Sequence, residues 1–286
     1  MTTSTLSSGM IWGEALRHHD GTLWSSDTQG SSLVSIGASG EHREPLDSPT
    51  NGLWFLPDGR LAAARWRDKR IDVLEDGEFR VHADLSHLVE DALGDMTGTP
   101  EGRLYVDDMG EDPHSGAPVG RILAVDPDGS SRVAADGLRF PNGLAVLGAT
   151  LIVAETHGAC LTAFDIADGE GRLDNRRVWA DLAVMFDERH RPDGIWPAGD
   201  GSVWVAATTG QAFVRVRGPQ VLDRIPTPGE FAISCCLAGT ALYLSASRST
   251  DPHLDLLTEA LPQRKVGGRI TRIDLSAQTD SSHAKD

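Results

Sequence analysis

One short phrase occurs six times along the chain: a turn pair followed by a strand of hydrophobic and small residues. The copies are DGTLWSSD (20–27), DGRLAAAR (58–65), EGRLYVDD (101–108), GATLIVAE (148–155), DGSVWVAA (200–207) and GTALYLSA (239–246). A strand-bearing repeat of about 40 to 50 residues is typical of a propeller blade, which needs neighbours to bury its hydrophobic face. Six copies therefore predict an all-β fold, a six-bladed β-propeller.

Each repeat predicts a four-stranded antiparallel blade. Asp-Gly pairs between β-prone segments indicate hairpin turns, because glycine accepts the positive φ that these turns require. A β-sandwich would explain the hairpins but not six copies of one phrase. The fourth repeat predicts strands at 142–148, 150–155, 160–166 and 176–182, and the third predicts the same order with strands at 121–126 and 131–136.

The repeats leave no room for a domain boundary. We expect a single domain over residues 1–286, with flexible tails at 1–10 and 276–286. Residues 3–12 are also a candidate for the strand that closes the last blade, although their pattern is weak. Three cysteines, Cys160, Cys235 and Cys236, form no disulfide framework, because an odd count with an adjacent pair suits reduced, buried thiols.

The chain is acidic, with 26 basic residues against 42 acidic ones and a net charge of −16. This charge opposes nucleic acid and anionic membranes and favours bound cations. Residues 1–10 contain neither a basic cluster nor an apolar run, and no stretch approaches the ~18 apolar residues of a membrane span. We therefore expect a cytoplasmic monomer or weak dimer with no nucleic-acid or membrane partner.

Oxygen-bearing side chains recur at one phase of the blade. If the first strand of each blade lines the central channel, the residues at its start face one axis. They are Glu14, Asn51, Gly94 with Asp95, Asn142, Asp193 and Ser234. Ca²⁺ prefers such carboxylate and amide oxygens, whereas zinc and copper sites are rich in His or Cys. Ca²⁺ is thus the best fit, with Zn²⁺, Mn²⁺ and Mg²⁺ as alternatives, although an Asn before Gly, taken singly, is often a plain turn residue.

Three segments carry a resemblance to a known family. The phrases WGEAL (12–16), FPNGLAV (140–146) and RPDGIWPAGDGSVWVA (191–206) are similar to signature segments of the senescence marker protein-30/gluconolactonase/regucalcin family, six-bladed propellers that are calcium-dependent lactonases. The similarity covers about residues 12 to 275. It implies that Glu14, Asn142 and Asp193 bind the metal, and that Asp193 is the catalytic base for a water attacking a lactone carbonyl polarised by the metal.

The third blade departs from this family. Relatives usually have Asn-Asp at the start of its first strand, whereas this chain has Gly94-Asp95. We expect either that water fills the missing position or that Asp95 or Asn51 replaces the amide. Asp95 is therefore a second candidate catalytic residue, and Asn51 a candidate substrate-binding residue. Because aldonolactone relatives hold the substrate with that Asn, its loss indicates a different or less polar substrate.

Two long segments between second and third strands, 107–120 and 247–268, are expected to cover the channel mouth. The second contains 253–261, whose apolar spacing suits a short amphipathic helix. Trp66 and His157 lie in equivalent loops and are candidate substrate contacts, with plain loop packing as the alternative.

These observations favour a metal-dependent hydrolase of a small lactone or related ester, a gluconolactonase-like enzyme. No GxSxG elbow or other nucleophile phrase is present. Two alternatives stay open because function depends on the site and not on the fold. The same scaffold could act on phosphoesters or in biosynthetic ring opening and rearrangement, or it could be a non-catalytic calcium-binding or partner-binding propeller.

Overall fold

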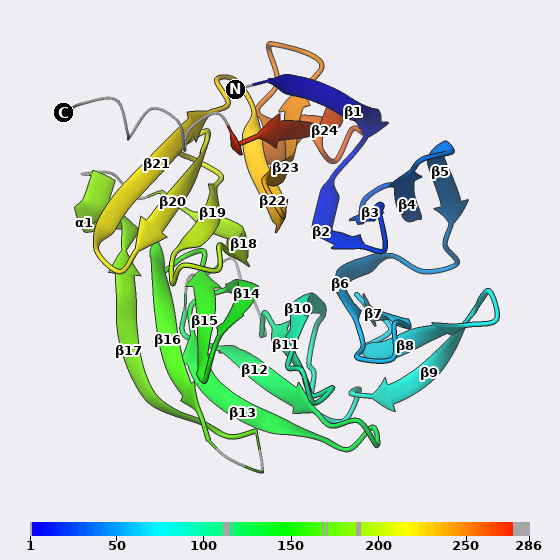
Figure 1. The fold of residues 1–286 in the computed structure, drawn as a ribbon, viewed down its shortest axis with the longest axis vertical. Coiled ribbons are helices and arrows are strands. Elements are labelled where there is room, and N and C mark those ends of the chain that lie inside the picture. Colours follow the sequence, from blue (N-terminus) through cyan, green and yellow to red (C-terminus); the bar gives the residue numbers. More distant parts are fainter. Residues whose placement is uncertain are drawn as a thin grey trace.

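Six four-stranded antiparallel sheets surround a central axis and form a six-bladed β-propeller (Figure 1). They are seen in a computed structural model that describes residues 2–110, 115, 117–167, 169, 171–186 and 190–276. The predicted fold class is confirmed, and each blade has the predicted order of strands from the axis outward.

The strands of the six blades have the following bounds. Blade 1 contains β2 (Gly13–His19), β3 (Thr22–Asp27), β4 (Ser32–Gly37) and β5 (Gly40–Pro45); blade 2 contains β6 (Thr50–Phe55), β7 (Leu61–Arg65), β8 (Arg70–Glu75) and β9 (Glu78–Asp84). Blade 3 contains β10 (Leu93–Gly98), β11 (Leu104–Asp108), β12 (Gly120–Val125) and β13 (Ser131–Leu138); blade 4 contains β14 (Pro141–Leu147), β15 (Thr150–Glu155), β16 (Cys160–Ile166) and β17 (Leu173–Asp181). Blade 5 contains β18 (Pro192–Pro197), β19 (Val203–Ala207), β20 (Ala212–Arg217) and β21 (Gln220–Pro226); blade 6 contains β22 (Phe231–Ala238), β23 (Ala241–Ser249), β24 (Val266–Asp274) and β1 (Thr3–Met10).

The first strands of the blades, β2, β6, β10, β14, β18 and β22, pack beside one another around the axis (Figure 1). The hydrophobic core lies between neighbouring blades: one cluster joins Ile71 of blade 2 to Leu104 and Leu123 of blade 3. Each sheet therefore buries its faces against the next one, as the repeat requires. At the first predicted turn, Asp20 and Gly21 both have positive φ, 45° and 74°, as a type I′ hairpin requires.

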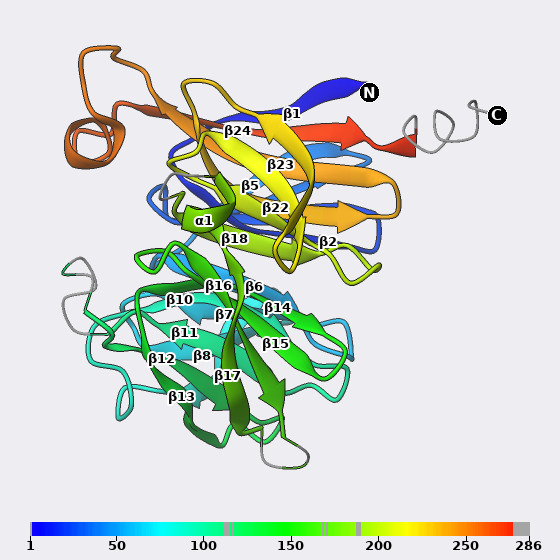
Figure 2. The same cartoon turned by 90° about the vertical axis from the view of Figure 1, so that its left-hand side faces the viewer.

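The N-terminal segment is part of the ring. The expectation of a flexible tail at 1–10 is wrong for residues 3–10, which form β1, the outermost strand of blade 6. β1 lies beside β24 (Figure 2) and pairs with it antiparallel, with Thr3 opposite Ile273 and Ser8 opposite Arg269. Pairing satisfies the backbone groups that an edge strand would otherwise expose. Of the expected C-terminal tail, 277–286 lies outside the described residues.

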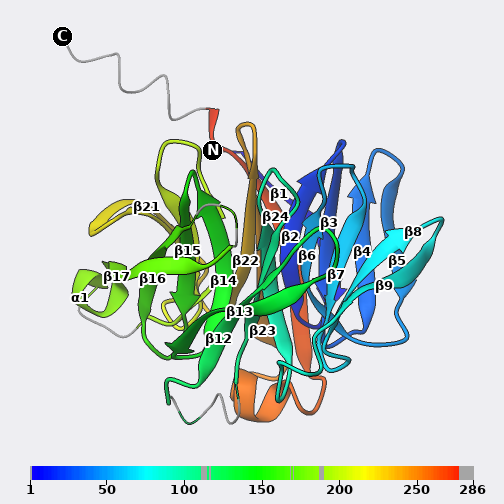
Figure 3. The ribbon, with the colours of Figure 1, turned by 90° about the horizontal axis from the view of Figure 1, so that it is seen from below.

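The two long loops are shorter than predicted because strands extend into them. β11 ends at Asp108 and β12 begins at Gly120, and residues 111–114 and 116 between them lie outside the described part. In the second loop the predicted helix is present as a single π-helical turn, η2 (Leu256–Ala260), which projects from one face of the disc (Figure 3). The Asp255 side chain caps it by accepting a hydrogen bond from the Thr258 N–H at 2.9 Å.

A second short helix, α1 (Leu182–Phe186), follows β17. Within the described ranges, neither helix nor any other is long and apolar enough to cross a membrane.

Candidate functional site

A β-bulge interrupts every inner strand at the same phase. In four of them the register with the second strand shifts between Thr50 and Leu53, Leu93 and Met96, Pro141 and Leu144, and Pro192 and Ile195. Asn51, Asp95, Asn142 and Asp193 therefore lie inside bulges, and Glu14 borders the bulge of β2. Bulges re-aim side chains and are common beside active sites. The repeat thus places one set of polar side chains around the axis.

Glycines next to two of these residues let the inner strands approach one another. A Cβ at Gly143 would lie 2.5 Å from the Asp193 carbonyl oxygen, and one at Gly194 would lie 2.8 Å from the Ile233 carbonyl oxygen. Asn142-Gly143 and Asp193-Gly194 are therefore not turns. Their glycines are needed for close contact between blades, and this contact brings Asn142 and Asp193 together.

Glu14 and Asp193 are buried carboxylates, with 7% and 6% of their surface exposed. Burial, followed by the charges of Asp193 and Asp95, raises the pKa of Glu14 well above its usual range. Burial and then the charge of Asp95 raise the pKa of Asp193 to about 8. Trp12 Nε1 donates to Glu14 Oε1 at 2.8 Å, and Thr208 Oγ1 donates to Asp193 Oδ2 at 3.5 Å. Asp193 Oδ1 is buried without a hydrogen-bond partner among the described residues.

Asn142 joins blades 4 and 5. Its Nδ2 donates to Thr156 Oγ1 at 3.3 Å, and this hydroxyl donates to the Pro192 carbonyl at 2.7 Å. The Asn142 amide also lowers the pKa of the Asp193 carboxylate and so partly offsets the rise caused by burial. The structure therefore brings Asn142 and Asp193 together. The charge of Asp193 also raises the pKa of Glu14, which belongs to blade 1.

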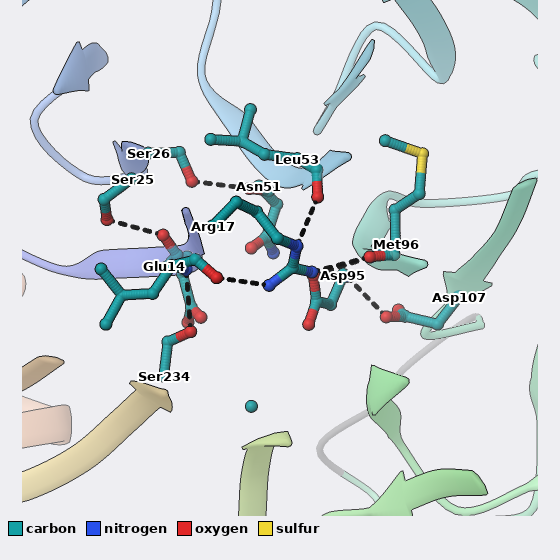
Figure 4. Close-up of polar contacts among 12 residues, drawn as sticks. Glu14, Arg17, Ser25, Ser26, Asn51, Leu53, Asp95, Met96, Asp107 and Ser234 are labelled. Atoms are coloured by element: carbon teal, nitrogen blue, oxygen red, sulfur yellow. Dashed lines mark hydrogen bonds and ion pairs between the residues drawn. The ribbon is translucent and has the colours of Figure 1, made fainter. Parts of the chain in front are cut away.

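Asp95 is bound by an arginine that the sequence analysis did not single out. Arg17 Nη2 lies 2.9 Å from Asp95 Oδ1, and each side chain is 4% exposed (Figure 4). Its guanidinium also donates to the carbonyl oxygens of Leu16, Leu53 and Met96, and lies 5.5 and 5.3 Å from the ring centroids of Trp54 and Trp196. The catalytic role of Asp95 stays a prediction, but its charge is paired.

Asp107 is a second residue that the sequence analysis missed. It lies near the end of β11 and is completely buried. Its Oδ2 accepts a hydrogen bond from the Asp95 N–H at 2.6 Å (Figure 4), while Oδ1 lacks a partner in the described part of the chain. Burial and then the charge of Asp95 raise the pKa of Asp107 well above its usual range.

The predicted substrate contacts lie at the same end of their blades as the predicted ligands. β6 begins opposite the end of β7, so Asn51 and Trp66 share one end of blade 2. β14 begins opposite the end of β15, so Asn142 and His157 share the equivalent end of blade 4. The His157 ring packs edge-on against Phe140, with centroids 5.0 Å apart. Their contact with substrate stays a prediction.

The η2 segment contacts this rim. Leu256 and Ala260 pack with Ile11, Trp12 and Phe231. Because the Trp12 indole holds Glu14, η2 supports a predicted ligand from outside the ring.

The predicted donor set is chemically suited to a metal ion. Across the described residues, no three His, Cys, Asp or Glu side chains adopt a metal-binding arrangement. The predicted set has two carboxylates and one amide, Glu14, Asp193 and Asn142. Its chemistry fits a hard divalent cation, and Asp193 Oδ1 is a buried acceptor that lacks a described partner. A cation would also offset the burial and the mutual repulsion that raise the pKa of both carboxylates.

The cysteines offer no alternative site. Cys235 and Cys236 are buried in β22, and no cysteine of the described chain forms a disulfide. Burial raises the pKa of the Cys236 thiol to about 12. Such a thiol is not ionised near neutral pH and is a poor nucleophile.

Fold and site together define a six-bladed propeller with carboxylate and amide oxygens gathered on its axis. Residues 6–248 match the family model described as SMP-30/Gluconolactonase/LRE-like region, and the chain belongs to this family. It is 27% identical to regucalcin of Danio rerio over 226 residues, which cover 76% of this chain and 71% of that protein.

Solved structures share the fold. A gluconolactonase from Xanthomonas campestris superimposes with a TM-score of 0.75 at 23% identity, covering 96% of this chain and 89% of that one. A luciferin-regenerating enzyme superimposes with a TM-score of 0.79 at 18% identity, covering 96% and 95%. At these identities the likeness concerns the fold.

Proposed function

We propose that the chain is a divalent-metal-dependent hydrolase of a small lactone or related ester. The observation that carries this proposal is the convergence of Glu14, Asn142 and Asp193, from three different blades, on one buried region of the axis. Membership of a family that includes gluconolactonases supports the substrate class. Ca²⁺ is the proposed cation because all three donors are hard oxygens.

The proposed roles follow from the contacts. Glu14, Asn142 and Asp193 hold the cation, which when bound supplies a Lewis acid that polarises the substrate carbonyl. Asp193 Oδ1, buried and unpartnered within the described residues, takes a proton from the attacking water. Thr208 orients the Asp193 carboxylate through Oδ2, and Trp12 orients Glu14.

Asp95 has a supporting role in this proposal. Its charge is the second cause of the raised pKa of Asp193, after burial. A carboxylate whose pKa is raised toward neutrality is a stronger base. Asp95 thereby increases the basicity of Asp193 while Arg17 holds it in place.

Asn51, Trp66 and His157 are the proposed substrate contacts. An amide, an indole and an imidazole at one rim suit a small molecule with an apolar ring and polar substituents.

Turnover with and without metal tests the proposal. Chelator-treated protein is assayed against γ- and δ-lactones, aryl esters and phosphotriesters, before and after addition of Ca²⁺, Zn²⁺, Mn²⁺ or Mg²⁺. We expect lactone hydrolysis that metal restores and that Asp193→Ala lowers by about 100-fold or more. Asp58→Asn, which removes an exposed carboxylate in the β6–β7 turn, is the matched control. Metal-independent turnover, or full activity of Asp193→Ala, would refute the proposal.

A further inference from the structure

The third repeat differs from the others at two positions that face each other. The seventh residue of the repeated phrase is small in five copies and is an aspartate, Asp107, in the third. In the other copies it is Ser26, Ala64, Ala154, Ala206 and Ser245. Conversely, the third blade has Gly94 at the phase where blades 1, 2, 4 and 5 carry Glu14, Asn51, Asn142 and Asp193. The third blade therefore has an aspartate on its second strand, where the other blades have a small residue, and a glycine on its first strand.

Geometry explains this exchange. A Cβ added at Gly94 would overlap the carboxylate of Asp107, whose Cγ would lie 2.6 Å away. The backbone of Gly94 does not have positive φ, so a side chain is excluded there by Asp107 and not by the backbone. The Asp107 carboxylate therefore occupies the volume that a side chain at position 94 would fill. The carboxylate comes from the second strand of the blade instead of the first.

Asp107 and its neighbour Asp95 differ in charge compensation. Asp95 is paired with Arg17 at 2.9 Å. No ion pair recorded within the described ranges includes Asp107, and its Oδ1 is completely buried without a partner there. The charge of Asp107 acts on Glu14, and that of Asp193 acts on Asp107, so the three carboxylates share one electrostatic environment. A carboxylate that is buried away from water without an opposite charge is unfavourable unless a cation or a hydrogen-bond donor stabilises it.

We propose that Asp107 is the contribution of blade 3 to the central site, where its carboxylate replaces a side chain at position 94 and adds a third negative charge to the surroundings of a divalent cation held by Glu14, Asn142 and Asp193. This inference rests on the proposed function. It differs from the three expectations drawn from the sequence, in which water, Asp95 or Asn51 took this place.

Calorimetric titration of the full chain with Ca²⁺ alone tests the inference. Asp107→Asn keeps the size of the side chain and removes its charge. Removing a charge from a divalent cation's low-dielectric surroundings is expected to weaken Ca²⁺ binding by about tenfold or more. Asp58→Asn removes the same charge from an exposed turn and is expected to change the affinity by less than about twofold.

Exchange variants test the shared volume. Gly94→Ala alone overpacks against Asp107 and is expected to lower Tm by about 2 °C or more. In the background of Asp107→Ala, Gly94→Ala is expected to lower Tm by much less, because the Asp107 carboxylate no longer fills the space beside position 94. Gly94→Asp combined with Asp107→Ala returns the carboxylate to the first strand, and we expect its Ca²⁺ affinity to exceed that of Asp107→Ala by about tenfold.

The outcomes separate the two proposals. If the wild-type protein binds no divalent cation, the proposed function and this inference both fail. If the wild-type protein binds Ca²⁺ and Asp107→Asn, folded by circular dichroism, binds it equally well, this inference alone is overturned. Should Asp107→Asn not fold, the exchange variant decides: affinity restored to that of the wild type supports the role of Asp107, and affinity equal to that of Asp107→Ala overturns it.

Discussion

Arg17 and Asp95 form an ion pair of 2.9 Å inside the ring, where each side chain is 4% exposed. The remaining donors of Arg17 bind backbone carbonyls of β2, β6 and β10, so one guanidinium joins the inner strands of three blades. Burying a charge costs free energy unless it is paired and hydrogen-bonded, and Arg17 meets both conditions. Glu14, Asp107 and Asp193 are buried carboxylates that do not pair with Arg17.

Arg17→Met should destabilise the protein strongly. The change leaves the Asp95 carboxylate buried without its partner, and breaking a buried pair costs about 3–5 kcal/mol. Denaturant unfolding measures the loss in the free energy of unfolding. Arg172→Met is the control, because Arg172 pairs with Asp174 at the surface with 69% of its side chain exposed and should contribute at most about 1 kcal/mol. Equal stability of Arg17→Met and the wild type would contradict this account.

Cation binding should release a proton near neutral pH. Burial and the charge of Asp95 raise the pKa of Asp193 to about 8, so in the metal-free protein this carboxyl is mostly protonated at pH 7. A bound cation requires the ionised form and displaces the proton. We therefore expect Ca²⁺ affinity to rise between about pH 6 and 8 and to level off above the pKa.

Calorimetry in buffers of different ionisation enthalpy measures this linkage. Release of at least one proton per Ca²⁺ at pH 7, decreasing as the pH rises above the pKa of Asp193, is the expected result. Binding that is independent of both pH and buffer would show that Asp193 is ionised before the cation arrives.

The ring was predictable because its signal is repeated. Six copies of one phrase indicate six similar sheets, and blade symmetry then places Glu14, Asn142 and Asp193 on one axis. β1 was harder to recognise because it is an outer edge strand: Ser7 and Met10 are its buried residues, so little apolar alternation is present. Its partner, β24, lies at the other end of the chain.

The rest of the site depends on contacts between blades, which a single repeat does not contain. Arg17 follows Glu14 in the polar strand GEALRHH and resembles a surface residue until three blades meet around it. Asp107 did leave a signal, since it is the one carboxylate at a phase otherwise occupied by Ser or Ala. The signal can be interpreted only once the structure shows that the Asp107 carboxylate fills the space of a side chain at position 94.

Gly194→Ala should separate two inner strands. Its Cβ would lie 2.8 Å from the Ile233 carbonyl, so β18 and β22 must move apart. We expect a loss of about 1–3 kcal/mol in the free energy of unfolding, together with weaker Ca²⁺ binding because Asp193 moves with the strand. Gly37→Ala is the control, since a Cβ there meets Thr22 Oγ1 at 3.3 Å in an outer hairpin. Unchanged stability of Gly194→Ala would show that the strands need no glycine there.

Removal of residues 2–10 should open the ring at its last blade. β1 covers the edge of β24, and its Met10 is completely buried against Leu16, Leu23 and Ile270. Loss of a buried Met side chain alone costs about 2–5 kcal/mol, and the deletion also removes the β1–β24 hydrogen bonds. We therefore expect a lower Tm than for Met10→Ala and faster hydrogen exchange along β24.

The point variants identify what the deleted strand contributes. Met10→Ala should account for much of the lost stability, whereas Ser4→Ala, on the exposed part of the same strand, should change it by less than about 0.5 kcal/mol. β1 also leads directly to Trp12, whose indole holds Glu14, so the deletion is expected to weaken Ca²⁺ binding. If the deletion variant keeps the wild-type Tm and the protection of β24, then β1 does not close the ring in solution, and Glu14 must be positioned by Asp27, which accepts the backbone N–H groups of Ile11 and Trp12.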